Sequence, residues 1–161
     1  MVILVMGVAG SGKTTIGQRL AEDLGWTFID ADDVHPPANI KKMSAGQPLN
    51  DEDRAPWLAA LRQRIEECIA RGENAVVTCS ALKEHYRNII VVEPEKVKIV
   101  HLHGSPELLR SRISGRKGHF MSPAMLDSQL AALEPPRNAL ELDVAQTPPE
   151  LVTRIRQEFC V

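Results

Sequence analysis

The feature that most constrains this chain is a glycine-rich loop set between an apolar run and a helical pattern. Residues 2–6 are apolar and rich in β-branched side chains, as a parallel strand covered on both faces requires. The loop after it reads Gly7-Val8-Ala9-Gly10-Ser11-Gly12-Lys13-Thr14 and fits the pattern G-x-x-x-x-G-K-[ST] in full. Glycines let successive backbone N–H groups point at phosphate oxygens, and a helix predicted over 13–24 adds its positive N-terminus. The pattern therefore predicts a site for a nucleoside triphosphate.

We expect the nucleotide to contact the glycines of this loop and the hydroxyl and ammonium groups around the start of the helix. They are Gly7, Gly10, Ser11, Gly12, Lys13, Thr14 and Thr15. We expect Lys13 to reach the β- and γ-phosphates as a catalytic cation and Thr14 to bind Mg²⁺. The alternative is a glycine-rich strand-to-helix turn with a solvated lysine.

Apolar runs alternate with helical patterns along the whole chain. We expect strands at 2–6, 26–30, 75–79, 97–103 and 139–144, and helices at 13–24, 37–44, 54–71, 82–92, 105–115, 122–133 and from 147 onward. This alternation predicts an α/β fold, a three-layer sandwich with a mainly parallel sheet. A length of 161 residues corresponds to one domain. Ligands of such sheets bind at the carboxyl ends of the strands, so residues after each strand are candidates for chemistry.

Charge and composition exclude several classes of protein. The chain has 19 Lys and Arg against 21 Asp and Glu, so its formal net charge is −2, which argues against a general binder of nucleic acid or of membrane surfaces. No apolar run approaches the roughly 20 residues of a membrane helix. The three cysteines, Cys68, Cys79 and Cys160, form no C-x-x-C pair, as expected for reduced thiols in a cytoplasmic protein.

An acidic turn, Asp30-Ala31-Asp32-Asp33, follows the predicted second strand. In an extended chain Asp30 and Asp32 project to the same side, toward the glycine-rich loop on a neighbouring strand. We expect Asp30 to serve the Mg²⁺ ion and Asp32 to accept a proton from a substrate hydroxyl. The alternative is a solvated acidic turn. The chain has no D-x-x-G and no N-K-x-D, which favours a kinase that uses ATP on a small molecule over a GTPase.

Two arginines four positions apart, Arg112 and Arg116, share one face of the predicted helix that ends near Gly115. A guanidinium can stack on a purine, and a second can neutralise the γ-phosphate in the transition state. The pattern resembles the lid arginines of nucleoside monophosphate kinases. We therefore expect Arg112 to contact the nucleotide, Arg116 to be catalytic, and a lid at about 116–133. The alternative is a basic, solvated helix end.

Further motifs are specific to one family. They are His35-Pro36-Pro37-Ala38-Asn39-Ile40-Lys41-Lys42-Met43, the stretch from Gly46 to Leu58, Cys79-Ser80-Ala81-Leu82-Lys83 with Tyr86-Arg87, and His119-Phe120-Met121 with Ser128-Gln129. With the phosphate loop, they closely resemble the gluconokinase family of P-loop small-molecule kinases over about residues 2–134. The resemblance implies ATP-dependent phosphorylation of D-gluconate at its 6-hydroxyl. It also implies a five-stranded parallel sheet, as in shikimate and nucleotide kinases, a helical substrate-binding region at about 35–60, and a cytoplasmic, often dimeric protein.

Gluconate is an anion with many hydroxyls, so its pocket needs a fixed cation and several hydrogen-bonding groups. Besides Asp32, the candidates are His35, Asn39, Lys42, Arg54, Ser80, Lys83 and Arg87. We expect Arg54 to be the main carboxylate anchor, with Lys42 or Arg87 assisting, because its planar fork can make two hydrogen bonds.

Three of the charged candidates have a structural alternative. Arg54 can pair with Asp51 or Asp53, Lys42 can be solvated, and Arg87 can pair with Glu84. In the same way, Trp57 is expected in the core rather than under a sugar, and His101 and His103 in packing rather than on a metal. Two other functions remain open at this point: a P-loop kinase for shikimate or a nucleoside monophosphate, and a nucleotide-dependent binding module.

Overall fold

The computed structural model describes residues 1–115 and 122–161. Its strands are β1 (Val2–Met6), β2 (Thr27–Asp30), β3 (Ala75–Cys79), β4 (Val97–His103) and β5 (Leu140–Asp143). Its helices are α1 (Lys13–Leu24), α2 (Pro37–Ser44), α3 (Asp51–Ala70), α4 (Glu84–Ile90), α5 (Pro106–Ser114), α6 (Pro123–Ala132) and α7 (Pro148–Phe159), with a 3₁₀ turn at Ala31–Val34. The strands form one parallel sheet in the order β2-β3-β1-β4-β5, which confirms the predicted α/β P-loop fold.

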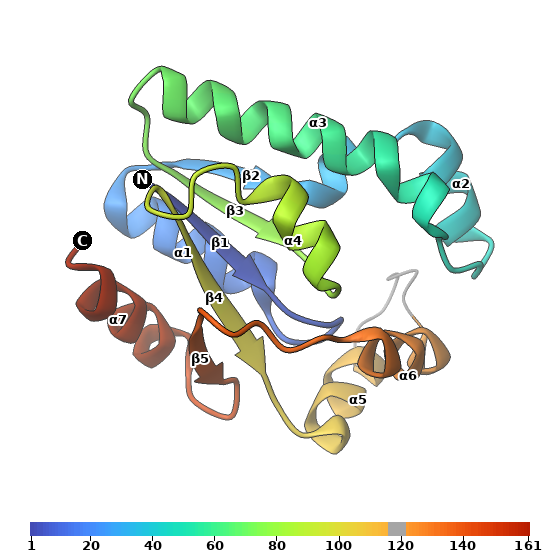
Figure 1. Cartoon of the computed structure of the whole chain (residues 1–161). Coiled ribbons are helices and arrows are strands. Elements are labelled where there is room, and N and C mark those ends of the chain that lie inside the picture. Colours follow the sequence, from blue (N-terminus) through green and yellow to red (C-terminus); the bar gives the residue numbers. More distant parts are fainter. Residues whose placement is uncertain (116–121) are drawn as a thin grey trace.

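The central strand β1 is buried on both faces, and its side chains alternate between two cores. Ile3 and Val5 pack with apolar residues of α1 and α7. Val2, Leu4 and Met6 face the other way and pack with residues of α3 and α4. Figure 1 shows the same three layers, with α3 and α4 on one side of the sheet and α1 and α7 on the other.

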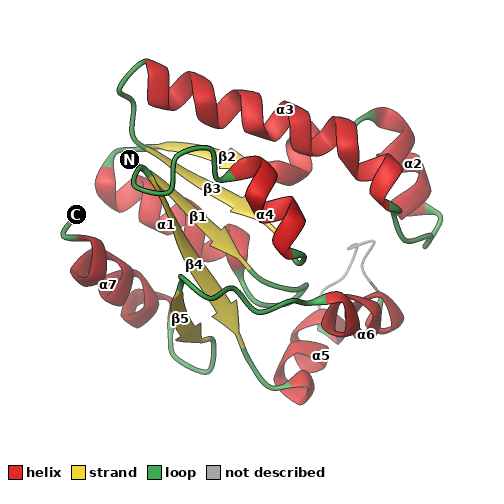
Figure 2. Cartoon of the chain, in the orientation of Figure 1, coloured by secondary structure: helices red, strands yellow, loops and turns green. Residues whose placement is uncertain are grey.

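All strands point in one direction, so their carboxyl ends meet at a single edge of the sheet. Figures 1 and 2 show that α5 and α6 lie beyond this edge, where the loops that follow the strands also gather. The phosphate loop follows β1, the acidic turn follows β2 and the Ser80 segment follows β3. The topology therefore brings three of the predicted motifs to one end of the molecule.

Two helix boundaries differ from the sequence-based expectation. Helix α3 begins at Asp51 rather than Arg54 because Asn50 caps it: the Asn50 side chain accepts the Asp53 N–H, and the Asp53 side chain accepts the Asn50 N–H. Helix α4 is shorter than expected and covers only Glu84–Ile90. The expected fifth strand is present as β5.

Candidate active site

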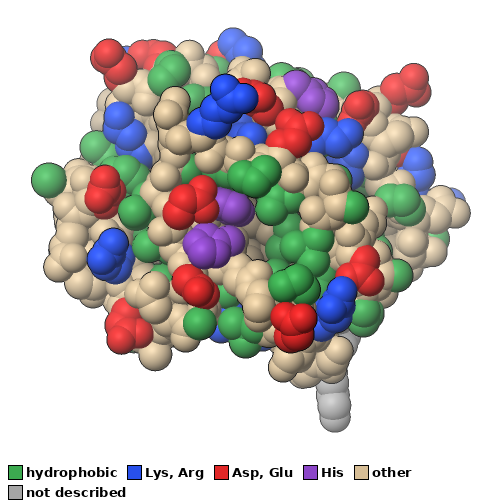
Figure 3. Space-filling model, turned by 60° about the horizontal axis from the view of Figure 1, so that its bottom comes forward, with side chains coloured by type: hydrophobic (Ala, Val, Ile, Leu, Met, Phe, Trp, Pro, Cys, Tyr) green, Lys and Arg blue, Asp and Glu red, His purple; other side chains and the backbone are tan. Residues whose placement is uncertain are grey.

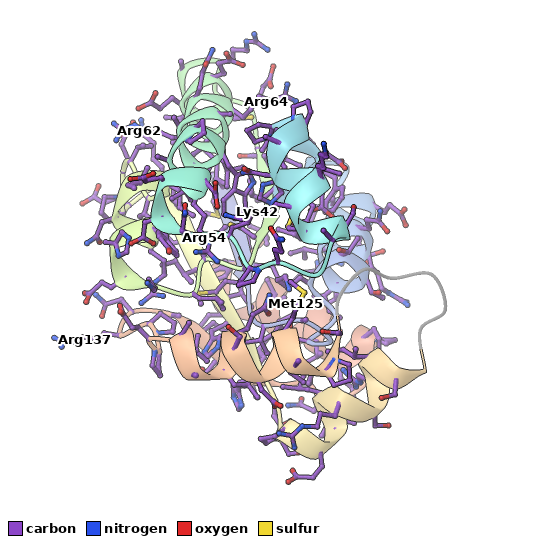
Figure 4. The ribbon with its side chains drawn as sticks, turned by 90° about the vertical axis from the view of Figure 1, so that its right-hand side faces the viewer. Lys42, Arg54, Arg62, Arg64, Met125 and Arg137 are labelled. Atoms are coloured by element: carbon purple, nitrogen blue, oxygen red, sulfur yellow. The ribbon has the colours of Figure 1, made fainter. Side chains whose placement is uncertain are left out.

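A pocket of about 160 Å³ lies at the carboxyl edge of the sheet. Its walls come from the phosphate loop, the ends of β2 and β3, and helices α2, α3 and α6. Figure 4 shows Met125 rising from α6 toward the helices that carry Lys42 and Arg54. The predicted site residues among its lining are Gly10, Gly12, Lys13, Thr14, Asp30, Asp32, His35, Arg54 and Ser80.

The phosphate loop has a backbone that only glycine allows at its tightest points. A Cβ on Gly7 would lie 2.6 Å from the Leu102 carbonyl oxygen, and one on Gly10 would lie 2.9 Å from the Leu109 carbonyl oxygen. Gly12 has a φ of 86° and caps α1 without any side-chain hydrogen bond, so the first N–H groups of α1 keep their capacity for a ligand. The Lys13 ammonium donates to the Val8 carbonyl at 3.1 Å and lines the pocket. This cradle fits the phosphates of a nucleotide.

Thr14, Asp30 and Asp32 lie together, but not by the geometry that the sequence suggested. The chain turns into a 3₁₀ helix at Ala31, so Asp30 and Asp32 are not neighbours on an extended strand, and that premise was wrong. Instead, the Asp30 carboxylate caps the turn by accepting the Asp32 N–H at 3.0 Å, and it also accepts the Thr14 hydroxyl at 3.2 Å. Both aspartates still line the pocket.

The surroundings of Asp30 fit a hydrated divalent cation. Thr78 of β3 pairs in register with Asp30 and lines the pocket. Its methyl group packs against α1 so closely that a Cβ on Gly17 would lie 2.4 Å from it. Among the described residues its buried hydroxyl has no hydrogen-bond partner. A carboxylate, two hydroxyls and a polar cavity are the oxygen donor set that Mg²⁺ prefers.

His35 is held neutral in the pocket wall. Its ring stacks on Trp57 at 4.3 Å between centroids, and the Trp57 indole N–H donates to the Ala31 carbonyl at 2.6 Å. Burial lowers the pKa of His35 to about 4; the positive charge of Arg54 adds to this shift and Asp30 opposes it. The His35 Nε2 atom lies 3.8 Å from the Asp32 carboxylate. Trp57 is thus both a core residue, as expected, and part of the pocket lining.

Arg54 reaches the pocket from α3 and is held from behind by Tyr86 of α4. Its Nη1 atom donates to the Tyr86 hydroxyl at 3.2 Å, and its guanidinium lies 5.4 Å from the centre of the tyrosine ring. The Tyr86 hydroxyl in turn donates to the Asp51 carboxylate, whose pKa this bond lowers. The link from Arg54 to Asp51 is therefore mediated by Tyr86 rather than by a direct ion pair.

Three predicted substrate contacts are engaged with other residues of the protein. Lys42 pairs with Asp53 at 2.6 Å, and the Asn39 amide donates to the Asp53 carbonyl at 2.8 Å. Lys83 lies 3.8 Å from Asp51 and over the Tyr86 ring. These side chains brace the start of α3, and through it Arg54.

Arg87 is buried and donates to the carbonyls of Ala81 and Leu82 at 2.9 and 3.1 Å. It lies on a different groove, beside Asn88 and Leu140. Ala81 has a φ of 45°, a strained value for a residue other than glycine, so Arg87 holds the loop that carries Ser80. The predicted direct contact of Arg87 with substrate does not match this position.

The predicted lid falls only partly within the described residues. Arg116 and the motif 119–121 lie outside them. Arg112 donates to the Val144 carbonyl at 2.7 Å, which places its guanidinium beside the end of β5. The segment 123–132 is helix α6, anchored by the fully buried Leu126 and by an ion pair of Arg110 with Asp127 at 2.7 Å.

Sequence reasoning missed the apolar and amide part of the lining. These residues are Ala9, Met43, Pro48, Leu49, Cys79, Leu82, Met125, Ser128, Gln129 and Ala132. All of them except Met125 and Ala132 stand in the phosphate loop or in the motifs that resemble the gluconokinase family, which was the available signal. Gln129 makes a specific contact, since its Oε1 atom accepts the Ala9 N–H at 2.7 Å.

Outside the pocket, His101 pairs with Glu141 at 2.7 Å and His103 lies 4.0 Å from the same carboxylate. No group of three His, Cys, Asp or Glu residues able to hold a metal ion occurs in the part of the chain that the structure describes.

The face shown in Figure 3 mixes acidic and basic side chains, in keeping with the small net charge. Among the described helices, none is long and apolar enough to cross a membrane.

The buried, neutral state of His35 gives a pH dependence to stability. Between about pH 6.5 and 4 the unfolded chain binds a proton at His35 and the folded chain does not, so the free energy of unfolding falls as pH drops through this window. We expect His35→Gln to flatten this part of the curve, measured by urea unfolding from pH 8 to 4. His85→Gln, on the exposed face of α4, is the control and should keep the wild-type slope. A wild-type slope in His35→Gln would contradict the assignment.

The sequence of this chain is similar to those of known proteins. Residues 2–136 match the family described as AAA domain. The chain is 49% identical over 134 residues to the gluconokinase of Gluconobacter oxydans (strain 621H), with 83% of this chain and 75% of that protein covered. It is 44% identical over 176 residues to a probable gluconokinase of Xenopus tropicalis, with 98% of this chain and 93% of the relative covered.

A solved structure agrees with both relatives. A crystal structure of a gluconokinase from Sinorhizobium meliloti 1021 matches with a TM-score of 0.85 at 43% identity, and the match covers 98% of this chain and 94% of the other. Sequence and fold thus agree over nearly the whole length, and the chain belongs to the gluconokinase family.

Proposed function

We propose that this protein transfers the γ-phosphoryl group of ATP to the 6-hydroxyl of D-gluconate and forms 6-phospho-D-gluconate and ADP. The observation that carries this is one pocket in which a phosphate loop, an aspartate pair and an arginine meet. The named relatives of this chain are gluconokinases, so shikimate and nucleoside monophosphates are less favoured as acceptors.

On the nucleotide side, the loop glycines, Ser11, Lys13, Thr14 and Thr15 bind the phosphates, and Thr14 with Asp30 would hold Mg²⁺. When bound, the cation neutralises charge on the β- and γ-phosphates. Lys13 adds a fixed positive charge on the same oxygens, where charge stabilisation contributes most to phosphoryl transfer. Arg112 supports the nucleotide near the end of β5, and Arg116, which lies outside the described residues, acts on the transferred group.

On the acceptor side, the oxygen of the 6-hydroxyl forms a bond to the γ-phosphorus while the bond from that phosphorus to ADP breaks. The proton of the hydroxyl passes to Asp32, whose side chain is 70% exposed and open to the pocket. His35, Ser80 and Arg54 also line the pocket and contact the sugar acid, with Arg54 on its carboxylate. A cytoplasmic location and a homodimer stay predictions from the resemblance.

Removal of the proposed base gives the first test. We expect Asp32→Asn to lower turnover with gluconate by about 10²-fold, because general-base catalysis contributes 10²–10⁴-fold and a loose transition state needs the base late. ATP affinity should change little. The matched control is Asp33→Asn, an exposed carboxylate on the same 3₁₀ turn, which should keep wild-type turnover. If Asp30→Asn proves more damaging at saturating Mg²⁺ than Asp32→Asn, the two roles are reversed.

The acceptor is tested by a panel of gluconate, glucose, shikimate and nucleoside monophosphates with ADP release as the readout. We expect gluconate to be used best and neutral glucose poorly, because glucose leaves the arginine unpaired. Arg54→Lys should lower kcat/KM for gluconate by roughly tenfold to a hundredfold, since charged hydrogen bonds contribute about 1.5–3 kcal/mol.

Arg62→Lys is the control for this substitution, because Arg62 is exposed on the same helix and pairs with Glu66. It should leave the kinetics unchanged. Unaltered gluconate kinetics in Arg54→Lys would mean that the carboxylate is held elsewhere, and preference for shikimate or a nucleotide would overturn the proposed acceptor.

A further inference from the structure

The phosphate loop and α6 are joined by a hydrogen bond across 120 positions of sequence. The backbone N–H of Ala9 donates to the Oε1 atom of Gln129 at 2.7 Å. Ala9 is only 8% exposed, so this bond is shielded from solvent on the loop side. Both residues line the pocket.

Helix α6 is held firmly enough for this bond to position the loop. Leu126 is fully buried, and Asp127 pairs with Arg110 of α5. Beyond the end of α6, the Glu134 carboxylate accepts the Glu84 N–H at 2.7 Å, and the Glu134 N–H donates to the Leu82 carbonyl at 2.8 Å. The helix therefore links the phosphate loop to the segment after β3, which carries Ser80 on the acceptor wall.

The neutral amide of Gln129 is suited to its position beside the phosphate loop. An amide oxygen accepts the Ala9 N–H and fixes that peptide plane without adding charge. A carboxylate would accept the same bond, but it would place a negative charge beside the phosphates that the pocket has to bind. An apolar side chain of similar size would fill the space and leave the N–H without this acceptor.

We propose that Gln129 is a positioning residue for phosphoryl transfer, which fixes the Ala9 peptide and so aligns the phosphate loop with the α6 wall of the pocket. This role of Gln129 rests on the proposed function only in that gluconate is taken as the acceptor. Correct alignment of reacting groups is worth a large factor in rate, and a displacement of about 1 Å can cost about 10²-fold. Gln129 thus acts through the loop and not on the reacting atoms.

Two substitutions separate alignment from packing. Gln129→Met removes the acceptor at similar volume, and Gln129→Glu keeps an acceptor and adds charge. The control is Gln63→Met on α3, where an exposed glutamine bonds to Glu67 at 3.0 Å. For each variant we would measure kcat, the KM values of ATP and gluconate, the melting temperature, and the affinity for a non-hydrolysable ATP analogue by calorimetry.

We expect Gln129→Met to lower kcat by about tenfold or more through lost alignment, with the KM of gluconate nearly unchanged. Gln129→Glu should keep the melting temperature but bind the ATP analogue at least about tenfold more weakly, an effect that added salt reduces because it is electrostatic. Gln63→Met should match wild type. Wild-type kcat in Gln129→Met, or identical behaviour of the Met and Glu variants, would overturn the proposal.

The calorimetric measurement of affinity for the ATP analogue does not depend on which acceptor the enzyme uses. If the wild type fails with gluconate but uses another acceptor, the proposed function fails and the same kcat comparison is made with that acceptor. If it uses none, the affinity of Gln129→Met for the ATP analogue is compared with that of wild type: weaker binding by the variant supports the role of Gln129 in fixing the loop, and equal binding refutes it.

Discussion

The rest of the site depends on how tightly the phosphate loop packs at the end of β1. Gly7 and Gly10 bring the loop against the carbonyls of Leu102 and Leu109, at distances that leave no room for a Cβ. The loop is thereby fixed to β4 and α5, and β1 beneath it is buried on both faces. This close packing restrains the loop backbone at Gly7 and Gly10, so its N–H groups are oriented before any ligand arrives, which favours strong electrostatic binding of phosphate.

Around this fixed loop, the charged groups of the acceptor side are mostly paired within the protein. Lys42 is bound to Asp53, Lys83 lies near Asp51, and Arg87 holds backbone carbonyls. Arg54 differs because its neutral partner, the Tyr86 hydroxyl, positions the guanidinium without neutralising it. An arginine held this way keeps its charge for an anionic ligand, which explains why one cation of this region is the strongest candidate for the carboxylate.

Local patterns in the sequence were enough to predict the fold and the edge of the sheet at which the pocket lies. The apolar run 2–6, the glycine loop and the alternation of elements predicted the parallel sheet and the place of the pocket. The start of α3 was misplaced because the reciprocal bonds of Asn50 and Asp53 were not recognised as a cap. The partners of Lys42 and Gln129 could not be predicted, since they lie on other elements and depend on how the helices pack. The pair Asp30 and Asp32 was selected on the assumption of an extended chain, but the chain forms a 3₁₀ turn there.

In the proposed reaction, phosphate is transferred to the end of gluconate that lies beside Asp32, away from Arg54. The most direct measurement is a proton-coupled phosphorus NMR spectrum of the product formed from ATP and D-gluconate. We expect a phosphomonoester signal split into a triplet by the two protons on C6, because the primary hydroxyl is the acceptor. A doublet, which marks a secondary hydroxyl, or the absence of any new phosphomonoester would contradict it.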